Sequence, residues 1–187
     1  MKVIFLDVDG VLNNMAWAQK MYEEKGIPVF RDDILCEPSL LLLQKLAQET
    51  GAQIVLSSSW RNIPSARANL VKTLEQYGLS IHSDTPYVGG IRGEDIASWM
   101  KRHPEIELET YVILDDDSDM LVPQFPHFIQ TSFADGFEEK HYLRAKKILE
   151  GAIDCGEPLT KNKVFVTALE LAGMSESELL DDIEEDE

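Results

Sequence analysis

The chain begins with a short apolar segment that ends in two acids, Lys2-Val3-Ile4-Phe5-Leu6-Asp7-Val8-Asp9-Gly10-Val11-Leu12-Asn13. The run from Lys2 to Val8 is apolar and stops at Asp9-Gly10, which predicts a buried strand followed by a turn. Residues two apart on a strand point to the same side, so we expect Asp7 and Asp9 to face one crevice. Two carboxylates placed together there repel each other, and a divalent cation would relieve that repulsion.

Apolar runs and helical patterns alternate along the rest of the chain. Short apolar runs predict strands over residues 52–57, 79–82, 110–114 and 127–131. Apolar periodicity with start and stop signals predicts helices over 15–25, 38–49, 62 or 65 to 77, 95–102, 138–153 and 159–171. Within the last of these, Val164-Phe165-Val166 could instead form a strand. This alternation predicts the α/β class, as a Rossmann-like doubly wound parallel sheet.

Length and composition fit one globular domain. The chain has 187 residues, of which 44% are hydrophobic and 27% are charged. Cys36 and Cys155 stand far apart and form no Cys-x-x-Cys pair, so they indicate neither a zinc site nor a disulfide framework. The longest aliphatic run, Leu40 to Leu43, is too short to cross a bilayer. Asp7 and Asp9 stand where a signal peptide needs apolar residues, so we expect no export and a cytoplasmic location.

The net charge of −17 is concentrated partly at the C-terminus. Residues 174–187 contain eight acids and no base, which leaves 26 acids against 17 bases, a net charge of −9, in the rest. A body this acidic repels polyanions, which argues against broad nucleic-acid binding but permits a local basic pocket for one phosphate. We expect residues 1–153 to form the catalytic domain and 154–187 a helical extension with a disordered acidic tail. That tail is either a solvated end or a partner-binding peptide.

Acids and hydroxyls follow three of the predicted strands. Asp7 and Asp9 follow the first strand, Ser57-Ser58-Ser59 the second, and Asp115-Asp116-Asp117 the strand over 110–114. Ligands of open parallel sheets bind beyond the carboxyl ends of the strands, so these side chains are expected to converge there. A single acidic strand end would more simply be a helix cap or turn, but three agree. Carboxylates and phosphate oxygens suit Mg²⁺, so the sequence predicts a magnesium site.

These segments, in this order, resemble the motifs of the haloacid dehalogenase-like (HAD) superfamily of aspartate-nucleophile phosphotransferases. The matching motif one is Asp7-Val8-Asp9-Gly10-Val11-Leu12, motif two is the strand that ends in Ser57, and motif four is Leu114-Asp115-Asp116-Asp117-Ser118-Asp119. Motif three is usually a lysine, and Arg92, 23 residues before Asp115, is the candidate here. Motifs one and four carry the specificity of this resemblance, which covers roughly residues 1–150.

A narrower likeness rests on shorter strings. Leu56 to Arg61, Arg92 to Ile96 and Val112 to Asp116 are similar to the small phosphatase-like domains of some multidomain RNA-repair proteins. Both resemblances imply a HAD-like domain with phosphatase activity.

The superfamily resemblance implies a role for each residue that touches phosphate. Asp7 would be the nucleophile that forms an aspartyl-phosphate. Asp9 would protonate the leaving alcohol and then act as base for the hydrolytic water. Ser57 would donate to a phosphate oxygen, and Arg92 would supply positive charge in place of lysine.

The same resemblance implies how Mg²⁺ is held. Its ligands would be an Asp7 oxygen, the main-chain carbonyl of Asp9 and Asp115. Asp116 or Asp119 would complete the site, and the sequence leaves that choice open.

Further substrate contacts are expected next to motifs one and two. Ser58, Arg61 and Asn13 are the candidates, although Asn13 also suits the turn after motif one. Arginine binds phosphate through two parallel donors, so Arg61 is an alternative to Arg92 for the motif-three role. An equally good interpretation makes Arg61 a surface residue paired with an acid. Trp60 is better explained by packing at a helix start than by base stacking.

The expected substrate follows from the lack of a sizeable cap domain. The segments from Asn13 to Glu37 and from Trp60 to Arg92 are too short to fold as domains. An open crevice suits an exposed phosphate on a nucleotide, a nucleic-acid end or a protein. The alternative is a non-catalytic HAD-fold interaction protein that acts through its C-terminal extension. The natural substrate and the oligomeric state stay open at this stage.

Overall fold

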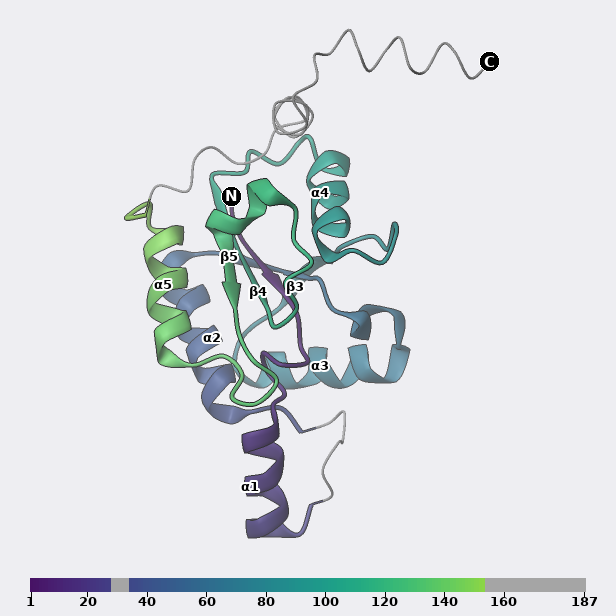
Figure 1. The fold of residues 1–187 in the computed structure, drawn as a ribbon, viewed down its shortest axis with the longest axis vertical. Coiled ribbons are helices and arrows are strands. Elements are labelled where there is room, and N and C mark those ends of the chain that lie inside the picture. The colour runs from purple at the N-terminus through teal and green to yellow at the C-terminus, as the bar shows by residue number, and fades with distance from the viewer. Residues whose placement is uncertain (28–33, 154–187) are drawn as a thin grey trace, which may run out of the picture.

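The structure is a computed structural model, and it describes residues 1–27 and 34–153. At its centre lies a five-stranded sheet in the order β3-β2-β1-β4-β5, and every neighbouring pair of strands is parallel (Figure 1). The predicted α/β class and parallel sheet are therefore confirmed. The strands are β1 (Lys2–Leu6), β2 (Gln53–Leu56), β3 (Ile81–Asp84), β4 (Thr110–Asp115) and β5 (Phe128–Gln130).

The connecting helices begin and end where local signals favour it. The Asn14 side chain accepts a hydrogen bond from the backbone N–H of Trp17 and so caps the first helix. Pro38 lies in the first turn of the second helix, where its missing N–H costs nothing. The α-helices are α1 (Met15–Lys25), α2 (Glu37–Thr50), α3 (Pro64–Gln76), α4 (Arg92–Arg102) and α5 (Glu139–Leu149), and the 3₁₀ helices are η1 (Ser59–Asn62) and η2 (Val122–His127).

Helices cover both faces of the sheet, and the strands are buried between them. Ile4 and Leu6 of β1 belong to a core cluster that includes residues of α2, α3 and α5. The alternate residues Val3 and Phe5 belong to a second cluster with α4. There the Trp99 ring meets the Phe5 ring edge-on, with centroids 5.3 Å apart. This alternation anchors β1 from both sides and fixes the residues that follow it.

Two expected elements near the site have different limits. β1 ends at Leu6 rather than Val8, because the Val8 carbonyl accepts N–H groups from the turn that follows, among them Leu12 at 2.8 Å. The helix expected from residue 95 begins at Arg92. Its extra turn is stabilised by Asp119, whose carboxylate accepts the backbone N–H of Arg92 at 2.8 Å.

Smaller differences occur elsewhere. The strand expected at 79–82 lies at Ile81–Asp84, because the Leu79 N–H bonds the Leu74 carbonyl and closes α3. The last described helix ends at Leu149 rather than 153. Neither η1 nor η2 was expected. The helix expected at 159–171, the tail and Cys155 lie outside the described residues.

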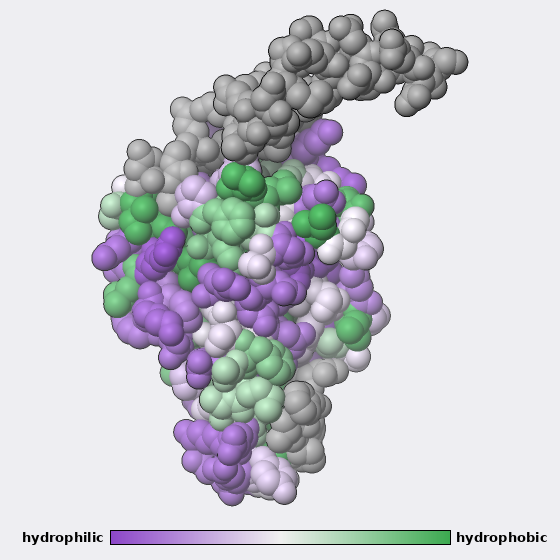
Figure 2. Space-filling model, viewed as in Figure 1, coloured by the Kyte–Doolittle hydropathy of each residue, from purple (hydrophilic) through white to green (hydrophobic). Residues whose placement is uncertain are grey.

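The described residues contain no large cap over the carboxyl edge of the sheet. α1 projects away from the body below that edge (Figure 1), and its outer end is mainly hydrophilic (Figure 2). The same view shows hydrophobic residues over η2, where Val122 and Phe125 are exposed (Figure 2). Among the described helices, none has the length and apolar character needed to cross a bilayer.

Candidate active site

The register of the sheet brings the ends of three strands to one level. Leu6 of β1 pairs with Leu56 of β2 and with Leu114 of β4. The next residue of each strand is therefore at the same height, and these residues are Asp7, Ser57 and Asp115. The hydrogen-bond ladder continues through them, since the Asp7 N–H donates to the Leu114 carbonyl at 2.9 Å and the Ser57 N–H to the Leu6 carbonyl at 2.8 Å.

Asp7, Asp115 and Asp116 form the acidic cluster of the site. One carboxylate oxygen from each lies within 4.8 Å of the others. Asp7 and Asp115 are buried, whereas Asp116 is half-buried. Gly10 makes room for this arrangement: it has φ of +69°, and a Cβ there would come within 2.2 Å of the Asp116 Cγ. Any larger residue would push the turn after β1 away from Asp116.

Arg92 lies between two acids of this cluster. Its Nη2 donates to Asp7 Oδ1 at 3.2 Å. Its Nε lies 2.9 Å from Asp115 Oδ2, but neither atom has a well-aligned hydrogen-bond partner, so this contact is mainly one of charge. The first turn of α4 thus delivers one cation to both carboxylates. Of the two arginines proposed for the motif-three role, Arg92 is the one in contact with the cluster.

Burial and mutual repulsion disfavour the ionised form of the acids in this cluster. Burial raises the pKa of Asp7 to about 6, although the Arg92 charge and a hydrogen bond from Ser58 act in the opposite direction. Burial, followed by the charge of Asp7, raises the pKa of Asp115 to about 8. Burial also raises the pKa of Asp116. Within the part of the chain that the structure describes, one arginine contacts a cluster of three carboxylates, so the cluster favours a further cation.

The two serines after β2 differ in their partners. Ser57 is buried, and its hydroxyl has no hydrogen-bond partner among the described residues. Ser58 is fully buried, its hydroxyl accepts the Trp60 N–H at 3.3 Å, and its side chain lowers the pKa of Asp7 through a hydrogen bond. Ser58 therefore supports the Asp7 carboxylate, while the Ser57 hydroxyl is available for an added oxygen. A buried hydroxyl without a partner is costly unless a ligand supplies one.

Asp9 lies near the acidic cluster, but its carboxylate is engaged elsewhere. Its charge contributes to the raised pKa of Asp7 and of Asp116. Its Oδ2 accepts the indole N–H of Trp60 at 2.8 Å, and its Oδ1 accepts the Asn13 amide at 2.7 Å. β1 ends at Leu6, so Asp7 and Asp9 both follow the strand and Asp9 lies in the turn, from which its charge still reaches Asp7 and Asp116. Asn13 thus contacts Asp9 directly.

The side chain of Arg61 is almost fully covered and already paired. Its guanidinium forms a salt bridge with Asp95, and only 4% of each side chain is exposed. Its Nη1 also donates to the Ser58 carbonyl at 2.6 Å. The second Asp95 oxygen accepts the Val88 N–H at 2.9 Å. The interpretation of Arg61 as a surface residue is wrong, although pairing with an acid is confirmed. This ion pair joins the segment after β2 to α4 and to the loop before it.

Asp119 lies apart from the acidic cluster. It is exposed, and its carboxylate accepts the backbone N–H of Arg92 at the start of α4. Its main-chain carbonyl accepts the Gly93 N–H at 3.1 Å. Of the two acids considered for completing a metal site, the structure brings Asp116 to Asp7 and Asp115, and it gives Asp119 the task of holding Arg92 in place.

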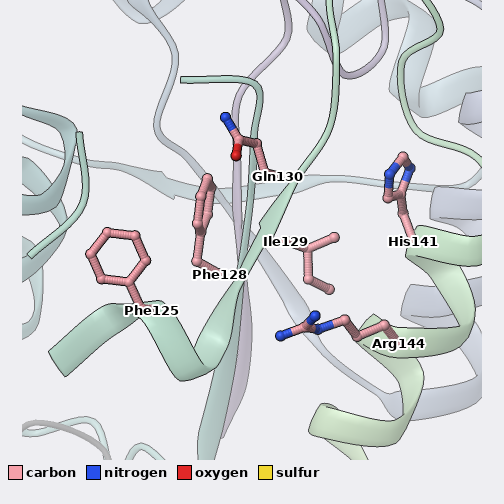
Figure 3. Close-up of a pocket in the computed structure, with 6 residues that line it drawn as sticks. All are labelled: Phe125, Phe128, Ile129, Gln130, His141 and Arg144. Atoms are coloured by element: carbon pink, nitrogen blue, oxygen red, sulfur yellow. The ribbon is translucent and has the colours of Figure 1, made fainter. Parts of the chain in front are cut away.

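A shallow hollow of about 340 Å³ lies at the β5 edge of the sheet (Figure 3). Its lining shares no residue with the acidic cluster, so we do not assign the chemistry to it. The lining residues, which come from η2, β5 and α5, are Phe125, Phe128, Ile129, Gln130, His141 and Arg144.

The acidic cluster fits a magnesium ion. Its donors are carboxylate oxygens, the ligand type that Mg²⁺ prefers, and its three carboxylates include the one or two that such sites typically use. The buried Asp115 Oδ2 has no aligned hydrogen-bond donor, so a ligand place is open on it. Among the described residues, Arg92 is the cation in contact with Asp7 and Asp115, and burial keeps the pKa of both acids raised in spite of it.

Sequence reasoning missed two residues of this region. Trp60 is buried, as expected for a packing residue, but its indole also bonds Asp9. Asp95 was counted only within a helix, and it is a buried acid paired with Arg61. The apolar pattern of α4 gives one signal for Asp95: it stands four residues before Trp99 and so on the buried side of the helix, where an acid needs a partner.

Comparison with known proteins identifies a family. A model of the family described as the HAD domain in Swiss Army Knife RNA repair proteins matches residues 3–142. The match includes the acidic cluster, Asp9, Ser57 and Arg92, and it confirms both resemblances found in the sequence. A search of curated proteins and a search of solved structures each found no match.

Proposed function

Because this chain belongs to the family of HAD domains in Swiss Army Knife RNA repair proteins, we propose that it is a magnesium-dependent phosphomonoester hydrolase. Such domains are phosphatase-type hydrolases that act on phosphorylated substrates. One observation supports the proposal most strongly, namely the buried cluster of Asp7, Asp115 and Asp116 with Arg92 between two of them. A cluster of this kind is expensive to build for stability alone.

Asp7 is the nucleophile in this proposal. Its carboxylate oxygen attacks phosphorus, the bond from phosphorus to the leaving oxygen breaks, and an aspartyl-phosphate forms. Arg92 and Ser58 hold the carboxylate in place. Water then attacks the same phosphorus, the bond between phosphorus and the Asp7 oxygen breaks, and inorganic phosphate leaves with Asp7 free again.

Asp9 transfers the protons. It gives one to the departing alkoxide and later takes one from the attacking water, so its protonation state is restored after each cycle. Its position beside the cluster, and the two N–H groups that hold it, support this role.

Ser57 and Arg92 bind the phosphoryl group. The unpartnered Ser57 hydroxyl donates to one phosphate oxygen, and the Arg92 guanidinium offsets the charge that develops in the transition state. Asp7, Asp115 and Asp116, with the Asp9 main-chain carbonyl, would hold Mg²⁺. When bound, Mg²⁺ lowers the repulsion between an anionic nucleophile and an anionic phosphate.

The proposed substrate is the terminal phosphate of a nucleotide or nucleic-acid strand. The family's description as a component of RNA repair proteins supports this class. The crevice has no large cap in the described residues, so it can admit the end of a long molecule. The net charge of −17 disfavours long contacts along a polyanion. Recognition of an end fits both observations better than recognition of a duplex.

Hydrolysis of p-nitrophenyl phosphate by the purified chain tests the activity. We expect p-nitrophenol release that requires Mg²⁺ and stops with EDTA. The Asp9→Asn variant should release a burst of about one p-nitrophenol per enzyme and then stall, since this leaving group needs no acid but hydrolysis of the intermediate needs the base. An inactive wild-type protein that still binds Mg²⁺ would favour the non-catalytic interaction protein instead.

The substrate class needs a separate comparison. We expect a higher kcat/KM for an oligoribonucleotide with a terminal phosphate than for the matching nucleoside monophosphate, because contacts outside the crevice can contribute to the chemical step. Equal values, with a micromolar KM for the small substrate, would contradict the open-crevice argument.

A further inference from the structure

We propose that Trp60 and Asn13 are positioning residues that hold the Asp9 carboxylate in place for proton transfer to the leaving group. This inference rests on the proposed function, because it assigns a task to residues around its acid. The observation behind it is that the Trp60 indole N–H donates to one Asp9 oxygen at 2.8 Å and the Asn13 amide to the other at 2.7 Å.

The two donors fix Asp9 from opposite parts of the fold. Trp60 is 51 residues away in sequence, lies in η1 after β2, and is 4% exposed. Its backbone N–H also bonds the Ser58 hydroxyl, so the indole is mounted on the segment that supports Asp7. Asn13 lies in the turn after β1, where its carbonyl accepts the Gly10 N–H at 2.8 Å. A carboxylate bonded to two rigid donors keeps one rotamer.

The donors Trp60 and Asn13 hold the Asp9 carboxylate apart from the acidic cluster. Asp7 and Asp115 are paired with the cation Arg92 and face Asp116 in the acidic cluster. Asp9 is two residues from Asp7, yet its carboxylate is not among the oxygens of that cluster. The indole and amide N–H groups can only donate here, and they draw the carboxylate toward η1 and the turn after β1. They thereby keep it out of the cluster and available for proton transfer.

The consequence is a dependence on the leaving group. An alkoxide leaves poorly unless it is protonated as the bond to phosphorus breaks, whereas p-nitrophenolate leaves without help. General acid catalysis is worth about 10²–10⁴-fold in rate. Loosening Asp9 should therefore slow formation of the aspartyl-phosphate from an alkyl phosphate and largely spare its formation from p-nitrophenyl phosphate. The later hydrolysis of the intermediate is common to both substrates and does not enter kcat/KM.

The test compares kcat/KM for 2-glycerophosphate and p-nitrophenyl phosphate in Trp60→Phe, which keeps an aromatic ring and removes the N–H. The ratio of the two values should fall by about tenfold or more, part of the full worth of a general acid. Asn13→Ala should lower the same ratio without changing the core. In the Asp9→Asn background, which stalls after one turnover, the ratio is taken from single-turnover rates, and Trp60→Phe should lower it no further, since both changes affect one proton transfer.

Trp99→Phe is the matched control. Trp99 is also buried, and its indole N–H donates to the Ser83 hydroxyl at 2.9 Å, but it has no contact with Asp9. This variant loses the same kind of hydrogen bond from the same kind of core position. Its ratio should equal that of the wild type.

A measurement without turnover keeps the inference testable if a variant folds poorly. The indole N–H resonance of Trp60 in a ¹⁵N–¹H spectrum should shift in Asp9→Ala, while that of Trp99 stays in place. An unshifted Trp60 resonance would overturn the contact. An active wild type whose ratio survives both Trp60→Phe and Asn13→Ala would overturn the positioning role and leave the phosphatase proposal intact. An inactive wild type in which the Trp60 resonance still shifts would overturn both the phosphatase proposal and the positioning role. Only the hydrogen bond between Trp60 and Asp9 would then stand.

Discussion

Two half-buried arginines lie near the carboxyl edge of the sheet, and they are paired differently. Arg92 divides its guanidinium between Asp7 and Asp115, whose pKa values remain raised to about 6 and about 8. Arg61 pairs with the single acid Asp95, for which the charges balance one to one. Burial and an acidic partner are common to both arginines. The difference lies in the surplus of negative charge around Arg92. That surplus can bind a metal cation, as phosphate chemistry requires, whereas the balanced pair of Arg61 and Asp95 has no charge left to bind one.

The largest effect is expected on the Arg92 side, from Asp7→Asn. The amide keeps the shape of the carboxylate but is no nucleophile, so phosphatase activity should fall below detection. Because the pKa of Asp7 is raised, a neutral side chain is favoured there, and the metal-free variant should be at least as stable as the wild type. Activity assays and urea unfolding measure the two outcomes. Substantial activity in the purified variant would rule out Asp7 as nucleophile.

On the other side of the comparison, Arg61→Ala should act mainly on stability. It leaves Asp95 buried without its cation, and such changes cost about 3–5 kcal/mol. Urea unfolding measures the loss. The double variant Arg61→Met with Asp95→Asn removes both charges and keeps an acceptor for the Val88 N–H, so it should be more stable than Arg61→Ala. A normal stability with a raised KM would instead make Arg61 a substrate contact.

Arg92→Ala should show the opposite pattern. Loss of a preorganised contact to the transition state typically lowers kcat by about 10²–10³. The change in unfolding free energy should be smaller than for Arg61→Ala, because the acids left behind can bind protons or Mg²⁺. Steady-state kinetics and urea unfolding of the two variants, side by side, decide the comparison. A large loss of kcat in Arg61→Ala, with kcat retained in Arg92→Ala, would contradict the assignment of the catalytic role to Arg92.

The surplus charge also predicts how stability depends on pH. The folded-state pKa values of Asp7 and Asp115 lie above the unfolded value of 3.8, so the folded protein binds these protons more tightly. Their contribution to stability is present below pH 3.8 and is lost as the pH rises through about 6 and about 8. The urea midpoint in EDTA should fall between pH 5 and pH 8.5.

Asp115→Asn is the control for this pH effect. It should flatten the fall and leave unchanged the opposing contribution of His141, whose pKa is lowered by burial. Saturating Mg²⁺ should flatten the fall in the wild type. An equally steep fall in Asp115→Asn would mean that the acidic cluster is not its source.

The smallest effect is expected from Asp119→Asn. Asparagine can still accept the Arg92 N–H, so activity and its dependence on Mg²⁺ concentration should stay near wild type.

Asp116→Asn is the comparison for this variant. It should raise the Mg²⁺ concentration for half-maximal activity by about 10–100-fold, the range seen when support of a metal site is lost. The opposite order would place Asp119 rather than Asp116 at the ion.

Much of this site could be predicted from spacing alone. Asp7, Ser57 and Asp115 each end an apolar run, and parallel strands bring their carboxyl ends together whatever the details of packing. Arg92 could be named only as a candidate, because its reach depends on where α4 begins. That start is set by Asp119, 27 residues further along the chain, which no local pattern around Arg92 reveals.

The amino-acid sequence by itself determined the parallel sheet and the edge where acids and hydroxyls gather. The spacing of apolar residues and the residues at which each strand ends are local properties of the chain. Only the tertiary structure decided which partner each charged group meets. Asp9 and Asp7 are two residues apart, yet Trp60 and Asn13 hold one while Arg92 holds the other. Arg61 and Arg92 are the same residue type in the sequence. Their roles differ because a charge removed from water must be matched by the acids that the fold places within about 4 Å of it.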